Sequence, residues 1–376
     1  MKMSSNSNPI TVPFLDLHAG TMAQKDELMA AAERVLTSAR YIGGPEVAAF
    51  ETAFAAHVGA PIGIGVGNGL DAIILALQAV GVQAGDEVIV PSHTYIATWL
   101  AVTWLGAKPV PIEPDMATMN INPHLVAAAI TPRTKAILPV HLYGNAVDMD
   151  PILAAAKQHN IPVIADAAQA HGTLYKGQPI GAVSTCTWSL YPGKNLGAYG
   201  DAGAVTLADA DVAARIRRLG NYGSEKKYVH TEPNSGNSRL DPLQAAFLSV
   251  RLKTLEANNT RRRQIADRYL TELAGLPLTL PVVTPDSTPV WHLFVVRDSN
   301  RDKLQAHLLE NGVETLIHYP TAIHHQQAYA ALAPTLPPMP LAEQIASQVI
   351  SLPIGPHMPD FQVAQVIAAV KSYYAK

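Results

Sequence analysis

Short apolar runs alternate with amphipathic stretches between residues 86 and 207. This alternation predicts an α/β fold, in which a mainly parallel sheet carries helices on both faces. The predicted strands are 87–90, 108–112, 136–140, 162–165, 185–190 and 203–207, and the predicted helices between them are 96–105, 124–130 and 150–159. Ligands of such sheets bind at the carboxyl ends of the strands, which is where the polar residues of this region fall.

The segments on either side of this region extend the prediction. Helices are expected at 46–57 and 211–219, and a polar, glycine-rich loop at 221–237 is long enough to move or to contact a partner. One long helical region at 241–273 leads to a strand at 290–296 and to helices at 301–311 and 361–374. We therefore expect an N-terminal arm (1–13), a large domain (14–250) and a small C-terminal α+β domain (251–376).

Composition narrows the class of protein. Of 376 residues, 48% are hydrophobic and only 15% are charged, with a formal net charge of -3, so a folded core is expected and a nucleic-acid surface is not. Cys186 is the single cysteine, which excludes an intrachain disulfide and a cysteine metal cluster. Residues 1–12 contain no apolar run, so neither a signal peptide nor a membrane anchor is expected, and we predict a cytoplasmic protein.

Lys194 is the first candidate for chemistry. It lies in the segment Ser189-Leu190-Tyr191-Pro192-Gly193-Lys194-Asn195-Leu196-Gly197, directly after a predicted strand that Pro192 and Gly193 end. A lysine fixed and partly buried at a strand end suits Schiff-base chemistry, because burial lowers its pKa and leaves the amine nucleophilic. Taken alone, Lys194 would more often be a surface-loop residue.

A glycine-rich segment, Gly63-Ile64-Gly65-Val66-Gly67-Asn68-Gly69-Leu70-Asp71, passes from a strand-like start to the beginning of a helix. Backbone N–H groups at such a junction, together with the helix dipole, form an anion site. The glycines are also compatible with a dinucleotide loop, but no acidic residue obviously ends the next strand to bind a ribose. Binding of a single phosphate group is therefore a simpler prediction than binding of a dinucleotide.

Three further residues follow predicted strands. Tyr95 lies where a strand turns into a helix, so its ring could cover a planar ligand. Asp166 closes the strand at 162–165, and a buried carboxylate there needs a positive partner such as a protonated pyridine nitrogen; a helix N-cap is the other interpretation. Gln169 is then placed to contact an oxygen substituent of such a ring.

Several sequence blocks, in order, resemble the pyridoxal phosphate (PLP) transferases of fold type I, and more closely the DegT-type nucleotide-sugar aminotransferases. They are Gly67-Asn68-Gly69-Leu70-Asp71-Ala72, Pro91-Ser92-His93-Thr94-Tyr95, Asp166-Ala167-Ala168-Gln169-Ala170-His171-Gly172, Tyr191 to Gly197 with Gly200-Asp201, and Asn237-Ser238-Arg239-Leu240-Asp241. Together with Pro139-Val140-His141-Leu142-Tyr143-Gly144, they look most like the enzymes that aminate C3 of dTDP-linked 3-keto-6-deoxyhexoses.

The resemblance implies a role for each matching residue. Lys194 would bind the PLP aldehyde, Asp166 the ring nitrogen and Gln169 the ring hydroxyl, while Tyr95 would stack on the ring. The phosphate would be held by Gly69, Leu70, Asp71 and Ser189, and by Asn237 of a neighbouring subunit, which implies a homodimer with shared sites. Tyr191, His318 and Tyr319 would line the sugar side. The resemblance implies two substrates, an amino acid, which the family suggests is L-glutamate, and a nucleotide-linked keto sugar.

Some features depart from the pattern or point elsewhere. Leu70 replaces a hydroxyl residue common in the family, so only its backbone N–H can serve. Amination at C4 of a UDP- or dTDP-4-keto sugar, a non-catalytic PLP- or sugar-binding regulator and a nicotinamide-dependent oxidoreductase are the alternatives. The chain has 14 histidines, but none has a convincing ligand spacing, and the adjacent His324 and His325 would point apart on regular structure. No metal site is therefore expected.

Overall fold

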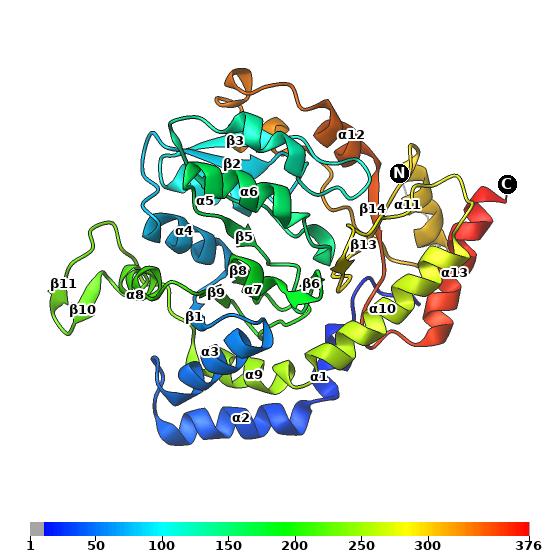
Figure 1. Ribbon diagram of the computed structural model, residues 1–376. Helices are drawn as coiled ribbons and strands as arrows, with labels where there is room; N and C mark the ends of the chain where they lie inside the picture. The colour runs from blue at the N-terminus through cyan, green and yellow to red at the C-terminus, as the bar shows by residue number, and fades with distance from the viewer. Residues whose placement is uncertain (1–10, 376) are drawn as a thin grey trace, which may run out of the picture.

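The computed structural model, which describes residues 11–375, is built around a twisted sheet (Figure 1). One group of strands has the order β1-β9-β8-β5 and another the order β3-β2-β4. Parallel bridges from Ile137 to Val163 and from Val140 to Asp166 join the two groups. Within these groups β9 is antiparallel to both of its neighbours, whereas the β5–β8, β2–β3 and β2–β4 pairs are parallel. The strands are β1 (Ile62–Val66), β2 (Glu87–Pro91), β3 (Lys108–Ile112), β4 (Thr134–Ile137), β5 (Ile164–Asp166), β8 (Thr185–Ser189) and β9 (Gly203–Leu207).

Alternation along the strands produces two apolar layers, one on each face of the sheet. Val88, Ile164 and Val205 pack with α4 (Gly69–Ala79), α5 (Ala97–Trp104) and α8 (Ala210–Leu219). Ile89, Ala165 and Trp188 pack with α3 (Pro45–His57), α6 (Met149–His159) and α9 (Pro242–Leu252) on the other face. The mainly parallel α/β sheet with helices on both faces is confirmed.

The C-terminal part has an apolar cluster of its own, which includes Phe294, Leu304 and Val366. It is built from α10 (Leu255–Glu272), β13 (Phe294–Arg297), α11 (Arg301–Glu310), β14 (Val349–Leu352) and α13 (Asp360–Tyr374). Buried Val12 belongs to the same cluster. Residues 1–10 of the expected arm lie outside the described part of the chain, and the boundary between residues 250 and 251 stays a prediction.

Shorter elements complete the chain. They are α1 (Leu17–Met22), α2 (Lys25–Ser38), η1 (Pro123–Leu125), η2 (Ala127–Ala129), η3 (Leu142–Gly144), β6 (Leu174–Tyr175), β7 (Gln178–Pro179), α7 (Ile180–Val183), β10 (Ser224–Lys226), β11 (Val229–His230), β12 (Ser287–Thr288), η4 (Ile323–His325), η5 (Gln327–Tyr329), η6 (Ala333–Thr335) and α12 (Pro340–Gln348). Among residues 11–375, no helix combines the length and apolar character needed to cross a membrane.

The strands expected at 136–140 and 162–165 are shifted to Thr134–Ile137 and Ile164–Asp166, and three other predicted elements differ more. Residues 124–130 form the short 3-10 turns η1 and η2, because Pro132 biases the preceding residue away from helix and leaves too few residues for a stable α-helix. The region 241–273 is two helices that Lys253 and Thr254 separate. The strand expected at 290–296 is confined to Phe294–Arg297, after Trp291 takes a left-handed φ of 47°.

Candidate active site

The candidate site is a cavity of about 770 Å³ at the carboxyl ends of β5 and β8, facing the start of α4. Ten of the residues proposed from the sequence line this cavity. They are Gly69, Leu70, Tyr95, Asp166, Gln169, Ser189, Tyr191, Lys194, His318 and Tyr319. Asp71 and Asn237 are not among its lining residues. The chain therefore brings most of the predicted site together within one subunit.

Lys194 lies in the turn that follows β8, where its backbone N–H donates to Tyr191 O over 2.9 Å. Burial lowers the pKa of its amine to about 8, although the nearby Asp166 carboxylate acts in the opposite direction. A substantial fraction of the amine is therefore neutral, and so nucleophilic, close to physiological pH. This property is what the sequence-based prediction required of Lys194.

Asp166 ends β5 and is only 6% exposed. Its Oδ1 accepts a hydrogen bond from Ala168 N (3.1 Å), and its Oδ2 accepts one from Thr98 Oγ1 (3.2 Å). Burial raises the pKa of the carboxyl, whereas the Ala168 N–H, the Lys194 charge and the Thr98 hydroxyl lower it. A cation bound beside Asp166 would favour the ionised carboxylate further. The N-cap interpretation is not what the structure shows, because no helix begins at Asp166.

The first turn of α4 and the end of β8 form a narrow backbone cradle. A Cβ built on Gly69 would lie 2.6 Å from Ser189 Cβ, so only glycine fits this approach. Asn68 caps the helix by accepting the Asp71 N–H over 2.9 Å. The Asp71 N–H therefore already has a partner, and the expected role of Asp71 in holding the phosphate stays a prediction. The earlier N–H groups of the turn, with the helix dipole behind them, remain suited to an anion.

Aromatic and amide side chains define the opposite wall. The rings of Tyr95 and Tyr319 lie 5.4 Å apart. Gln169 accepts the Tyr143 N–H at Oε1 (2.6 Å) and donates from Nε2 to the Tyr319 hydroxyl (3.1 Å). The second Nε2 hydrogen of Gln169 is the one that could serve a ligand. His318 Nδ1 lies 2.8 Å from Ser351 Oγ, and burial lowers its pKa to about 4, so its imidazole is neutral.

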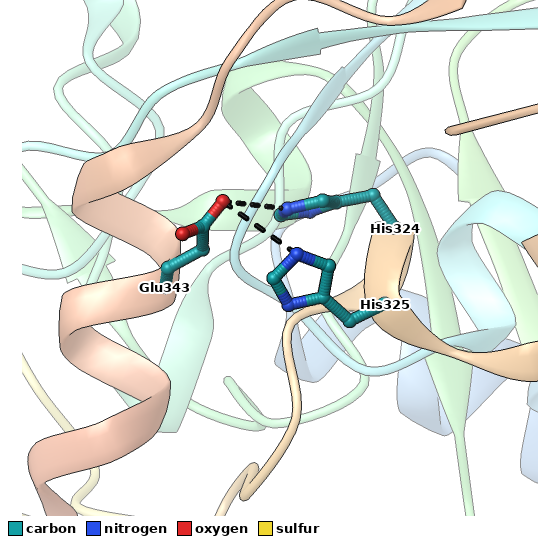
Figure 2. A group of neighbouring side chains, drawn as sticks. All are labelled: His324, His325 and Glu343. Atoms are coloured by element: carbon teal, nitrogen blue, oxygen red, sulfur yellow. Dashed lines mark hydrogen bonds and ion pairs between the residues drawn. The ribbon is translucent and has the colours of Figure 1, made fainter. Parts of the chain in front are cut away.

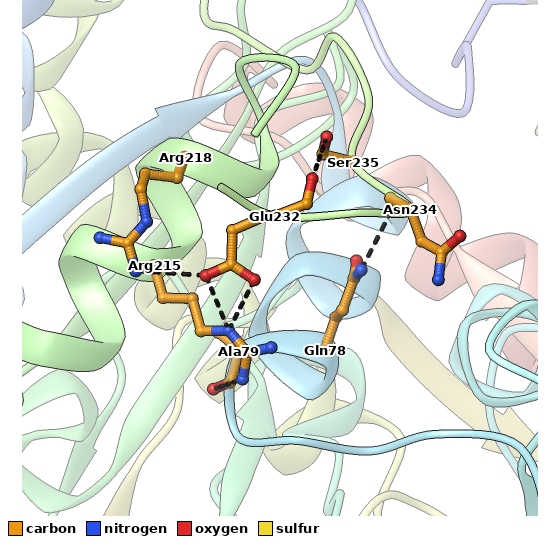
Figure 3. A network of polar contacts seen from close by, with 7 residues as sticks. All are labelled: Gln78, Ala79, Arg215, Arg218, Glu232, Asn234 and Ser235. Carbon is orange, nitrogen blue, oxygen red and sulfur yellow. Dashed lines mark hydrogen bonds and ion pairs between the residues drawn. The ribbon is translucent and has the colours of Figure 1, made fainter. Parts of the chain in front are cut away.

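The loop at 221–237, which ends at Asn237, is attached to helices α8 and α4 by a network of polar contacts (Figure 3). Glu232 receives Arg215 Nε (3.3 Å) and Arg218 Nη2 (3.2 Å), both from α8. Gln78 Nε2 of α4 also donates to Asn234 O over 3.0 Å. The loop contains the β10–β11 hairpin and is thereby held in a defined place, while Asn237 itself is exposed.

One expectation about histidines is wrong. His324 and His325 do not point apart, because they lie in the tight turn η4 and not on regular helix or strand. Their ring centroids are 4.1 Å apart, and both Nε2 atoms approach Glu343 Oε1, at 3.0 Å and 3.7 Å (Figure 2). This cluster lies outside the residues that line the cavity.

Sequence reasoning missed several residues of the site. Thr98 was not among the predicted site residues, although its hydroxyl donates to Asp166. Tyr143 was given no role of its own, yet its hydroxyl donates to His318 O over 2.5 Å and lies 2.8 Å from His93 Nε2. Because Tyr143 has a single hydroxyl proton, His93 must donate in this pair. These roles depend on contacts between distant segments, which sequence patterns do not reveal.

The donor set suits PLP. A buried lysine with a lowered pKa, a carboxylate at the end of the neighbouring strand and a glycine cradle at a helix N-terminus share one cavity. These are the groups that an aldehyde, a pyridine nitrogen and a phosphate require. The fold and the site thus define a PLP-dependent transferase of fold type I.

Comparison with known proteins gives the family. Residues 22–371 match the DegT/DnrJ/EryC1/StrS aminotransferase family, and the chain belongs to it. A Streptomyces venezuelae protein, dTDP-3-amino-3,4,6-trideoxy-alpha-D-glucose transaminase, is 52% identical over 99% of this chain and 98% of its own length. The erythromycin biosynthesis sensory transduction protein EryC1 of Saccharopolyspora erythraea is also 52% identical, over 96% of this chain and 99% of its own.

A solved structure agrees with the sequence comparison. The crystal structure of S. venezuelae DesV in complex with a ketimine intermediate superimposes with a TM-score of 0.95 at 51% identity, covering 98% of this chain and 100% of the other. The protein is therefore a PLP-dependent aminotransferase, as the sequence predicted.

Proposed function

We propose that this enzyme transfers an amino group from L-glutamate to C3 of a dTDP-linked 3-keto-6-deoxyhexose. The proposal rests on the position of Lys194, which is buried beside Asp166 in a cavity large enough for a sugar as well as a cofactor. The choice of C3 and dTDP is supported by the name of the 52% identical transaminase from S. venezuelae, whose length the chain matches almost completely.

In the proposed site, Lys194 would hold the cofactor aldehyde, Asp166 would pair with the ring nitrogen and Gln169 would bind the ring hydroxyl. Tyr95 would pack against the ring, and Gly69, Leu70 and Ser189 would hold the phosphate. Tyr191, His318 and Tyr319 line the side on which the sugar binds. All of these residues line the same cavity, which supports the assignment.

The reaction needs a base that can accept a proton and return it. PLP, when bound, supplies a carbonyl that exchanges between amines and a ring that withdraws electrons. Lys194 Nζ can accept and return the proton at the reacting carbon, because its pKa of about 8 lies close to the working pH. Asp166 stabilises positive charge at the ring nitrogen, and Thr98 holds the carboxylate in place with its hydroxyl.

We further propose a cytoplasmic homodimer in which Asn237 completes the phosphate site of the partner subunit. The support is that Asn237 is exposed and absent from the cavity of its own chain, and that the Glu232 network holds the preceding loop in place.

The direct test is to incubate the enzyme with glutamate, PLP and a panel of dTDP-3-keto, dTDP-4-keto and UDP-4-keto sugars, and to locate the new amine by NMR. We expect an amine at C3 of a dTDP sugar, and no turnover with Lys194→Ala. Amination at C4 would overturn the regiochemical part of the proposal.

A second candidate function is regulation without catalysis, which is favoured by the EryC1 relative being named a sensory transduction protein. Adding glutamate without a sugar distinguishes the two candidate functions. A transaminase shifts the absorbance of its bound PLP when glutamate is added, and forms 2-oxoglutarate in the same amount. A protein that binds PLP without forming 2-oxoglutarate, whatever sugar is present, would be the regulator.

A further inference from the structure

The cluster of His324, His325 and Glu343 has the composition of a metal site (Figure 2). The two imidazoles come from the turn η4, and the carboxylate comes from the first turn of α12. One ligand atom from each residue lies within 4.8 Å of the others. His325 and Glu343 have side chains that are 55% and 44% exposed, so a cation could enter from solvent, whereas the His324 side chain is only 9% exposed.

The two elements that carry these residues are fixed by their own packing. Ile323 of η4 and Ala342 of α12 belong to the same apolar cluster under the large sheet. The start of α12 is also held by Glu113, whose carboxylate accepts Leu341 N (2.8 Å) and Ala342 N (3.1 Å). The ligands therefore need little rearrangement to bind, which reduces the entropic cost of binding.

We propose that His324, His325 and Glu343 together bind one divalent transition-metal cation of the Zn²⁺ type, with water completing its coordination. Bonds of about 2.0–2.2 Å in a tetrahedral site place ligand atoms roughly 3.4 Å apart. The distances from Glu343 Oε1 to the two Nε2 atoms, 3.0 Å and 3.7 Å, bracket this value. Two nitrogen ligands favour Zn²⁺ over the oxygen-seeking Mg²⁺ and Ca²⁺.

The surroundings of His324 determine how tightly the cluster is expected to bind a cation. Its Nδ1 is buried and has no hydrogen-bond partner among the described residues. When Nε2 binds a cation, Nδ1 must carry the ring proton, and a ligating histidine that lacks an acceptor for this proton typically loses about 10–100-fold in metal affinity. We therefore expect binding in the micromolar range, weaker than in sites with a complete outer layer.

The position of the cluster gives binding a consequence. His324 lies five residues after Tyr319, which lines the active-site cavity and receives the Gln169 hydrogen bond. A cation that joins η4 to α12 would restrain the far end of this segment. If the cation changes the affinity of the cavity for a ligand, that ligand must change the affinity of the cluster for the cation by the same factor.

The test uses the PLP-loaded enzyme after chelator treatment, titrated with ZnCl2 in competition with a chromogenic chelator. We expect one Zn²⁺ per chain, and at least a tenfold weaker affinity in His325→Ala and in Glu343→Gln. Both changed side chains are substantially exposed, so the variants should fold. His124→Ala and Glu33→Gln, which alter exposed residues elsewhere, are the matched controls and should bind Zn²⁺ like the unchanged enzyme.

A second measurement addresses the geometry. Co²⁺ in place of Zn²⁺ should give visible absorption of tetrahedral intensity that is lost in Glu343→Gln. No binding at one equivalent per chain, or binding that His325→Ala and Glu343→Gln leave unchanged, would overturn the proposal. The second outcome would place the cation elsewhere, for example at the cofactor.

Discussion

Two opposing effects set the charge of Lys194 Nζ. Burial removes water from the ammonium and lowers its pKa, while the Asp166 carboxylate stabilises the charge and raises it. Burial has the larger effect, and the result is about 8. The same surroundings raise the pKa of Asp166, because burial there outweighs the Lys194 charge, the Ala168 N–H and the Thr98 hydroxyl. Both groups are thus closer to their neutral forms than they would be in water.

This balance predicts a pH dependence. Only the neutral amine of Lys194 attacks an aldehyde, so the rate at which the cofactor-free enzyme takes up PLP should rise with pH through a midpoint near 8. In Asp166→Asn the supporting negative charge is lost, and the midpoint should move to lower pH. The growth of aldimine absorbance in stopped flow measures both. A midpoint near the ordinary lysine value in the unchanged enzyme would contradict the burial argument.

A second prediction for a single residue concerns the hydroxyl of Thr98. Thr98→Val removes the hydroxyl that donates to Asp166 Oδ2 and keeps the size of the side chain. A hydrogen bond to a charged group contributes roughly 1.5–3 kcal/mol, so kcat/KM should fall about 10- to 100-fold. Thr103→Val is the control, because the Thr103 hydroxyl donates to Trp99 O of its own helix. Equal losses in the two variants would show that Thr98 acts on folding alone.

At the scale of elements, the contact between α4 and the β8–β9 hairpin gives the cradle its shape. A Cβ on Gly203 of β9 would lie 2.3 Å from Asn68 O, and one on Gly69 would lie 2.6 Å from Ser189 Cβ. Two glycines therefore allow the helix start to approach both strands. The backbone N–H groups of the first turn are consequently presented at the mouth of the cavity, where Gly69 and Leu70 line the wall.

Gly69→Ala should disrupt this approach. Inserting a methyl group into a well-packed contact costs typically about 1–3 kcal/mol, so Tm should fall, and the affinity for PLP should fall by more than tenfold because the cradle must open. Gly236→Ala is the control, because a Cβ there meets no atom within 4 Å. Calorimetry and PLP titration measure the two effects. Unchanged PLP affinity in Gly69→Ala would remove this segment from the phosphate site.

Sequence patterns predicted the elements whose residues determine them locally. Among them are the strands at 87–90 and 203–207 and the polar residues at the ends of β5 and β8. Apolar runs and strand-ending residues can be recognised in a sequence without knowledge of the fold. The break at Lys253 was not found, since neither proline nor glycine marks it. The partners of Thr98 and Tyr143, and the convergence of His324 and His325 on Glu343, depend on contacts between distant segments.

At the scale of the whole molecule, Asn195 joins the large sheet to the C-terminal part. The residue directly after Lys194 donates from Nδ2 to Asn259 Oδ1 (2.9 Å) and to Val290 O (3.0 Å). Asn259 in turn donates to His171 O over 2.8 Å. The position of Lys194 is therefore tied to α10 and to the segment before β13, so movement between the two parts of the chain would reach the reacting amine.

The proposed sharing of sites between subunits is tested by mixing two variants. Lys194→Ala and Asn237→Ala should each be inactive or weak alone. If Asn237 serves the partner's site, a mixed dimer has one intact site, and refolding the two in equal amounts should restore about a quarter of the normal activity. Size-exclusion chromatography checks that dimers form. No recovery above Asn237→Ala alone would show that Asn237 acts within its own chain or not at all.

The tightness of the turn around Lys194 limits how the enzyme could be redesigned. A Cβ on Gly197 would lie 2.4 Å from Pro192 O and 2.7 Å from Tyr191 O, so the turn itself has no space for a side chain at this position. Leu316 also lines the cavity and is 44% exposed, so its side chain is less tightly enclosed. Mutant libraries intended to broaden acceptor scope should therefore vary Leu316 and its neighbours and leave 191–197 as they are.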